Sequence, residues 1–181
     1  MLDDNFFYFL YSFAHRSPLL DALIVFFASY LPFLLVVAFV VFSFFLFPHW
    51  KKRFFLFLGL FLSGIIARGI FVSIIRFFYH RPRPFLAFDI DPLFTSSSFS
   101  FPSGHASLFF ALSFFLFFFS RKVGGLMLFL SFLVGVFRVV SGVHYPSDIL
   151  GGIILGFLSA LLVYKLFPSR AVFSEEGPQI S

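Results

Sequence analysis

Arg138, His144 and Asp148 place a guanidinium, an imidazole and a carboxylate in one short segment between two long apolar runs. Arg138 falls in the last turn expected for the preceding helix, where a cation complements the helix dipole. Pro146 suits the first turn of the next helix, so Asp148 would lie in that turn and His144 just before it. A carboxylate beside an imidazole fixes its tautomer and raises its basicity, as a nucleophile or general base requires. Taken alone, the segment fits a candidate active site and a solvated loop equally well.

Two further polar clusters stand at the ends of apolar runs. Pro102-Ser103-Gly104-His105 opens one run, so free backbone N–H groups and a small glycine would lie at a helix N-terminus, which favours anion binding. Arg76, Arg81 and Arg83 close an earlier run, with His80 among them. One arginine at a helix end is ordinary interface chemistry, but three such clusters in one chain indicate a site for an anionic group.

The three clusters resemble the motifs of the type 2 phosphatidic acid phosphatase (PAP2) superfamily of membrane lipid phosphatases. The family pattern is a lysine, six residues and Arg-Pro; then Pro-Ser-Gly-His; then Ser-Arg, five residues, a histidine, three residues and an aspartate. Here Arg76 occupies the lysine position and Phe137 the position of the first serine of the third motif. All other motif positions match, in the family's order, over residues 76–148.

The resemblance implies a two-step phosphoryl transfer that needs no cofactor and no obligatory metal. His144 would attack phosphorus to form a phosphohistidine, Asp148 would orient it, and His105 would protonate the leaving oxygen and then help to activate water. His80 and Arg81 could hold a second phosphate or contact lipid headgroups. The phosphate oxygens would be bound by Arg76, Arg83, Ser103, Gly104 and Arg138. The residues at hand include no acidic cluster that would hold magnesium.

The composition points to a membrane protein. Hydrophobic residues make up 60% of the 181 residues and charged residues only 12%, which exceeds the apolar share of a soluble domain. Because the cations cluster at the ends of apolar runs, the net charge of +5 does not indicate nucleic-acid binding. The chain has no cysteine, which excludes a disulfide framework and a thiolate metal site.

The apolar runs predict an all-α integral membrane protein, a bundle of five transmembrane helices with a short N-terminal interfacial helix. Residues 5–14 are too few to span a bilayer and form the interfacial helix. We expect the first span to kink near Pro32. The five spans are expected at 19–47, 54–78, 103–119, 123–141 and 147–167. Residues 1–167 would then form one phosphatase domain, and residues 168–181 a polar, disordered tail.

With five spans, all three motifs emerge on the same face of the membrane. The opposite face carries many of the lysines and arginines and is therefore expected to be cytoplasmic by the positive-inside rule. These residues are Lys51, Lys52, Arg53, Arg121, Lys122, Lys165 and Arg170. The site is accordingly expected on the extracytoplasmic side of a bacterial plasma membrane.

Within the spans, small residues and one charge carry structural expectations. Gly152 with Gly156, and Gly59 with Ser63, form small-xxx-small pairs that favour close helix packing. Arg68 lies near the middle of the second span, where a charge is costly and marks either function or a paired interior position. Here we expect it to meet backbone carbonyls or serines inside the bundle.

The outward site and the short five-span build look like the bacterial undecaprenyl-diphosphate phosphatases of this superfamily, which recycle the cell-wall carrier lipid. We expect an isoprenyl diphosphate to enter from the bilayer beside loop 85–101 and to be cleaved to the monophosphate. A phospholipid monoester, phosphatidylglycerophosphate or phosphatidate, is the alternative substrate. A small transporter is the non-enzyme alternative, although its charges should extend through the bilayer instead of gathering at one face. The sequence does not indicate the oligomeric state.

Overall fold

The computed structural model describes residues 2–46 and 49–166, and the regular elements of this part are all helices. Four are long and apolar enough to cross a membrane, over Pro18–Leu46, Trp50–Phe78, Arg121–Val140 and Pro146–Leu166. A fifth apolar helix, α7 (Gly104–Phe117), is shorter. The chain is therefore an all-helical membrane protein. The expected tail, 168–181, lies outside the described residues.

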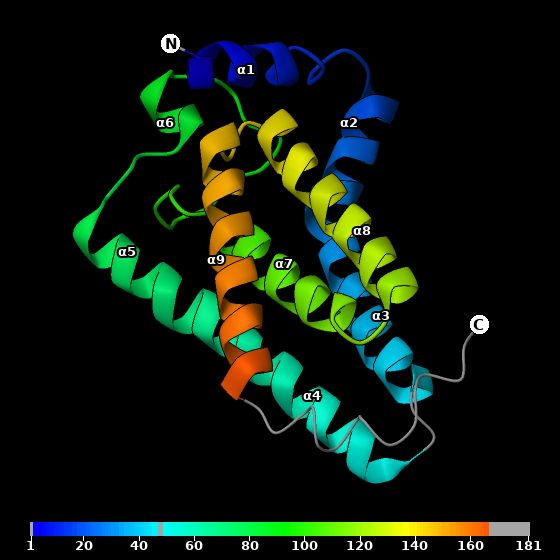
Figure 1. The fold of residues 1–181 in the computed structure, drawn as a ribbon. Coiled ribbons are helices and arrows are strands. Elements are labelled where there is room, and N and C mark those ends of the chain that lie inside the picture. The colour runs from blue at the N-terminus through cyan, green and yellow to red at the C-terminus, as the bar shows by residue number, and fades with distance from the viewer. Residues whose placement is uncertain (1, 47–48, 167–181) are drawn as a thin grey trace.

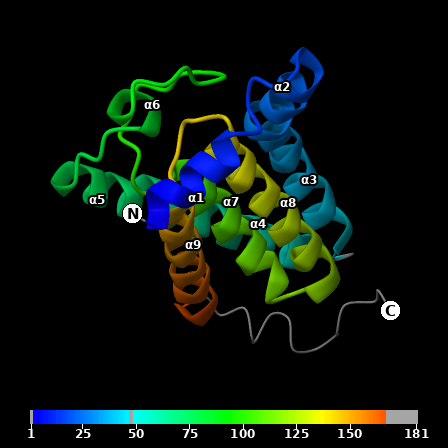
Figure 2. The same cartoon turned by 90° about the horizontal axis from the view of Figure 1, so that it is seen from above.

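The N-terminal helix α1 (Leu2–Tyr11) begins three residues earlier than expected and ends three residues earlier. Asp3 and Asp4 stand in its first turn, where negative charge is stabilised by the helix dipole. The helix lies across the end of the bundle at which α8 (Arg121–Val140) ends and α9 (Pro146–Leu166) begins (Figures 1 and 2). Phe7 is fully buried there against Phe88 and Tyr145.

The first long helix runs through α2 (Pro18–Val25), the π-helical segment η1 (Phe26–Tyr30) and α3 (Leu31–Leu46). Ser17 caps its start by accepting from the amide of Leu20. The amide of Leu31 donates to the carbonyl of Phe26, so the wide turn lies directly before Pro32, whose ring cannot donate and would crowd a regular turn. The irregularity expected at the proline is thus a π-helical turn.

The second long helix has the same construction, with α4 (Trp50–Gly64), η2 (Ile65–Phe71) and α5 (Val72–Phe78). A long connection follows, and it contains the short helix α6 (Pro84–Ala87). That connection leads to α7, and Ser120 then caps α8 by accepting from the amide of Val123. Helix α7 begins at Gly104 and ends at Phe117, so it is shorter than the expected span of 103–119.

Helix α7 forms the centre of the bundle, between α4, α8 and α9 (Figure 1). Its 14 residues correspond to about 21 Å of helix, less than the ~30 Å of a bilayer core. Gly152 and Gly156 of α9 let the two backbones approach closely, since a Cβ at Gly152 would lie 2.9 Å from the amide nitrogen of Ser107. Gly59 of α4 likewise faces the ring of Phe115. The close packing predicted for both glycine pairs is therefore confirmed at these glycines.

Candidate active site

The imidazole of His144 and the carboxylate of Asp148 are joined as their spacing predicts. Nδ1 of His144 lies 3.2 Å from Oδ2 of Asp148, and both side chains are at most 1% exposed. Helix α9 begins at Pro146, which puts Asp148 in its first turn, where the amide of Tyr145 also donates to Oδ2 at 2.9 Å. The turn before it contains Gly142 with φ 82°, a left-handed conformation that favours glycine.

The second nitrogen of His144 faces Arg83. Nη1 of Arg83 lies 3.3 Å from Nε2 of His144. A guanidinium can only donate and an ionised carboxylate can only accept, so the two neighbours together select the tautomer with the proton on Nδ1 and the lone pair on Nε2, which faces Arg83. Burial, reinforced by the charges of Arg138 and Arg83, lowers the pKa of His144 to about 3 against the opposing effect of Asp148. The imidazole is therefore neutral at neutral pH, with Nε2 available to attack.

Arg83 is itself held by the connection between α5 and α7. Its Nε donates to the carbonyl of Ser98 at 2.7 Å, its Nη2 to the Ser98 hydroxyl at 3.0 Å and its Nη1 to the carbonyl of Val143 at 2.7 Å. Burial, followed by the charge of Arg76, lowers the pKa of Arg83 to about 10. It therefore remains a cation at neutral pH, and its position is fixed before any substrate binds.

The Pro-Ser-Gly-His segment forms the N-terminus of α7, as predicted. Ser103 is the N-cap, and its side chain accepts from the amide of Ala106. Its own amide donates to the carbonyl of Asp148 at 3.0 Å, which ties this helix start to α9. Within the described residues the amides of Gly104 and His105 have no hydrogen-bond acceptor, so they are free to bind an anion.

Arg76 and Arg138 approach the same place from two other helices. Nη2 of Arg76 donates to the carbonyl of Pro102 at 2.9 Å. Nη1 of Arg138 donates to the carbonyl of Ala28, within η1, at 3.1 Å. The Nε atoms of both arginines are buried without a hydrogen-bond partner among the described residues, and buried donors of this kind need an acceptor.

The neighbour of Arg138, Phe137, does not belong to the site. Its ring stacks on that of Phe27 with 4.7 Å between the ring centroids. The position therefore contributes to helix packing, so its replacement of a serine removes no group that lines this site.

The charges around His105 are predominantly positive. Arg138, Arg68 and Arg83 all lie within electrostatic range of it. Among the residues that the structure describes, no three histidine or acidic side chains are grouped as a metal site would require. A cluster of guanidiniums, free amides and a nucleophilic imidazole is suited to holding and attacking a phosphate group.

The family model for the PAP2 superfamily matches residues 55–171, a range that includes all three motifs. The chain belongs to the PAP2 superfamily. The family resemblance seen in the sequence is therefore confirmed, and the protein is a PAP2 lipid phosphatase of the membrane.

Several known proteins resemble the chain over different lengths. Undecaprenyl-diphosphatase BcrC of Bacillus subtilis (strain 168) is 28% identical over 159 residues, which cover 86% of this chain and 79% of that protein. The bacitracin transport permease protein BcrC of Bacillus licheniformis is 52% identical over 69 residues, but these cover 38% of this chain and only 34% of that relative. The crystal structure of Aquifex aeolicus LpxE is 25% identical, with a TM-score of 0.72 over 91% of this chain and 96% of that one.

Three residues outside the motif positions support the carboxylate of Asp148: Ser100 and Arg81 contact it, and Asp3 contacts Arg81. The hydroxyl of Ser100 donates to Oδ2 of Asp148, and Nη1 of Arg81 lies 2.9 Å from Oδ1. Nη2 of Arg81 is paired with Asp3 of α1 at 2.8 Å. Asp3 also accepts from the amide of Ser147 at 2.9 Å. Sequence reasoning missed Asp3 and Ser100, because nothing in the sequence places α1 or the connection beside Asp148.

These contacts bear on the second phosphate site considered for His80 and Arg81. The guanidinium of Arg81 lies 3.7 Å from the centre of the Tyr145 ring, and its donors are directed to Asp3, Ser147 and Asp148. His80 is exposed, and its ring lies against that of Phe99 in a tilted arrangement. The two residues share a cavity of about 430 Å³ with Thr95 and the serines of residues 96–98. The donors of Arg81 are therefore already engaged and positioned to orient Asp148, whereas the exposed His80 lies at the rim of this cavity.

The PAP2 site should accordingly depend on the far N-terminus. We expect Asp3→Asn to lower kcat about tenfold with little change in KM, because Arg81 would lose one of its two carboxylates and hold Asp148 less firmly. The measurement is steady-state phosphate release from the purified full chain. Asp89→Asn makes the same charge change at an exposed loop position and should leave kcat unchanged. Equal losses in both variants would show that α1 does not position the site.

Proposed function

We propose that this PAP2 protein hydrolyses an isoprenyl diphosphate, undecaprenyl diphosphate, to the monophosphate through a phosphohistidine on His144. The observation that carries the proposal is the unprotonated Nε2 of a neutral, buried imidazole, which is held between Asp148 and Arg83. This Nε2 lies among guanidinium groups and next to the backbone amides at the start of α7. A nucleophile with its tautomer fixed by a carboxylate is the arrangement that covalent catalysis requires.

The reaction proceeds in two displacements. Nε2 of His144 forms a bond to the terminal phosphorus as the bond from that phosphorus to the bridging oxygen breaks, and His105, in its imidazolium form while the anionic substrate is bound, gives a proton to the leaving oxygen. A water molecule then attacks the phosphohistidine and transfers its proton to His105. The phosphorus–nitrogen bond breaks, inorganic phosphate leaves, and His144 returns to its neutral form. Atoms and protons balance over the cycle without a further reagent.

The phosphate oxygens are bound by donors from four parts of the chain. Arg76, Arg83 and Arg138 supply guanidinium groups, and the Ser103-Gly104 segment supplies the helix N-terminus. Preorganised donors of this kind stabilise the charge that develops on the transferring phosphoryl group. The unpaired Nε atoms of Arg76 and Arg138 support this assignment.

The similarity to an undecaprenyl-diphosphatase over 86% of the chain supports the diphosphate as substrate. A phospholipid monoester, such as phosphatidylglycerophosphate or phosphatidate, needs only the single phosphate site and is the second candidate. Transport, suggested by the name of the permease relative, is less well supported. The cations of the site gather at one end of the bundle, whereas a transport pathway needs polar groups through the bilayer.

The proposed membrane arrangement is five passages, with α7 as the third, and the site on the extracytoplasmic side. Lys51 and Lys52 at the start of α4 and Arg121 and Lys122 at the start of α8 lie at the end away from the site, as the positive-inside rule requires of a cytoplasmic face. A single cysteine at Ser97 should react with an impermeant thiol reagent in intact cells, and one at His49 should not. The reverse pattern would overturn the orientation.

The test of the substrate compares three lipids at equal surface concentration in detergent micelles. The purified protein should release phosphate from undecaprenyl diphosphate at least about tenfold faster than from phosphatidylglycerophosphate or phosphatidate, without added metal. Release from the monoesters at the higher rate would assign the chain to phospholipid metabolism. No release from any of the three would refute the phosphatase proposal.

A further inference from the structure

Arg68 is an exposed residue within a membrane-spanning helix. No hydrogen bond or ion pair engages it within the described residues, so the expectation that it meets carbonyls or serines inside the bundle is wrong. An unpaired charge at this depth is costly and marks a functional position. Its partner should therefore be an anion that is not part of the protein.

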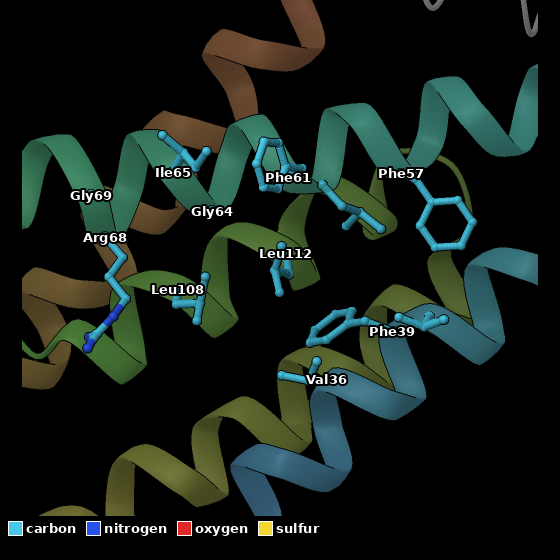
Figure 3. Close-up of a pocket in the computed structure, with 12 residues that line it drawn as sticks. Val36, Phe39, Phe57, Phe61, Gly64, Ile65, Arg68, Gly69, Leu108 and Leu112 are labelled. Carbon is cyan, nitrogen blue, oxygen red and sulfur yellow. The ribbon is translucent and has the colours of Figure 1, made fainter.

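Arg68 stands at one end of an apolar groove between α3, α4 and α7. The groove has a volume of about 600 Å³, and the other side chains that line it are apolar, among them Phe39, Phe61, Leu108 and Leu112. Figure 3 shows Arg68 at the end of the groove away from Phe57, with its nitrogen atoms directed beyond the lining residues. Phe61 is 62% exposed in the isolated chain, so this wall faces the bilayer. A groove of this kind is suited to a hydrocarbon chain.

The guanidinium group of Arg68 reaches the phosphate site. A Cβ at Gly104 would lie 1.9 Å from Nη1 of Arg68, so only glycine lets the guanidinium lie against the start of α7. Arg68 is also within electrostatic range of Arg76 and Arg138. A helix N-terminus and three cations repel one another, and together they require negative charge between them.

The π-helical segment η2 surrounds Arg68 in the chain. A π-helical turn adds a residue to an α-helix and so rotates the following side chains by about 100° relative to a regular helix. Arg76 follows η2 on the same continuous helix and reaches Pro102 at the start of α7. The wide turn thus allows two arginines, one on η2 and one on α5, to face the same helix N-terminus.

We propose that Arg68 binds the phosphate attached to the lipid, while the terminal phosphate lies before His144. This inference rests on the proposed function and adds the residue that selects a diphosphate. The order from the bilayer inward is then hydrocarbon chain in the groove, lipid-linked phosphate at Arg68, and terminal phosphate among Arg76, Arg83 and Arg138. When the bond between the terminal phosphorus and the bridging oxygen breaks, the lipid-linked phosphate receives that electron pair, and Arg68 stabilises the added charge.

The test uses farnesyl diphosphate and farnesyl monophosphate, which share one lipid chain and differ by one phosphate. Arg68→Gln should lower kcat/KM for the diphosphate about 10- to 100-fold, the value of a charge-assisted hydrogen bond, and change that for the monophosphate less than threefold. Arg68→Lys should recover most of the loss. Arg16→Gln, which removes an exposed charge outside the groove, should leave both substrates unaffected.

The outcomes separate this inference from the proposed function. A wild-type protein that releases phosphate neither from these two lipids nor from the three lipids tested above would refute the phosphatase itself. Active wild-type protein with equal losses on both lipids in Arg68→Gln, or with no loss, would overturn the role of Arg68 alone. Because Arg68 makes no hydrogen bond or ion pair within the described chain, its replacement should not lower the thermal unfolding temperature.

The proposed binding of the lipid chain in the groove is tested with a substitution that fills the groove. Leu112→Trp should raise the KM for farnesyl diphosphate several-fold and leave the KM for isopentenyl diphosphate unchanged, because only the longer chain reaches the middle of the groove. An equal change for both diphosphates, or none, would place the lipid chain elsewhere.

Discussion

Replacing His144 by alanine removes turnover, with a fall in kcat of at least about 10⁴-fold, the scale seen when a covalent nucleophile is lost. The reason is that no other imidazole in the described part of the chain has a carboxylate on one nitrogen and a guanidinium facing the other. The measurement is phosphate release by the purified variant in detergent. Its thermal unfolding is followed in parallel to establish that the protein is folded.

Stopping the reaction with a chemical quench tests directly whether His144 carries the phosphoryl group. Wild-type protein mixed with an isoprenyl diphosphate labelled in the terminal phosphate should carry label that is stable in base and released in acid, as expected of a phosphohistidine. The His144→Ala variant should carry none. His80→Ala, a change at an exposed histidine at the rim, is the matched control and should retain both label and turnover. A fully active His144→Ala protein would refute the assignment of the nucleophile.

The second large effect is expected at Arg83. Arg83→Ala should lower kcat/KM about 10³-fold, because it removes a phosphate donor and the group that faces Nε2 of His144. Arg83→Lys should lose about 10- to 100-fold. A lysine keeps the charge but offers a compact ammonium in place of a planar fork, and it cannot reproduce the contacts with Ser98 and Val143.

The control for this series is Arg16→Lys, at an exposed arginine whose Nε donates to the carbonyl of Ser12, and it should keep full activity. Binding of vanadate, which mimics the transferring phosphoryl group, separates the two roles of Arg83. A loss of vanadate affinity that parallels the loss of kcat/KM supports direct contact with phosphate. Unchanged vanadate affinity in Arg83→Ala would leave Arg83 with a structural role only.

The sequence by itself determined where the reactive side chains lie relative to the starts of the helices. Ser103 and Pro146 are residues whose own backbone and side-chain properties start helices, so His105 and Asp148 follow at known distances from a helix start. His144 and Asp148 meet because they are four residues apart across such a start. The apolar runs likewise identified a membrane protein from local sequence, because burial in lipid depends on the composition of each segment by itself. These inferences needed only local spacing.

The tertiary structure decided which side chains complete the site. Asp3 and Ser100 are far from Asp148 in the chain, and their contacts with Arg81 and Asp148 exist only because α1 and the connection before α7 pack over the end of the bundle. Arg68 has no motif partner, and its place beside Gly104 depends on η2 and on the close approach of two helices. The shorter α7 is likewise a result of packing, because a helix enclosed by neighbours need not match the bilayer thickness by itself. Contacts between distant segments follow from how helices pack, which local spacing does not specify.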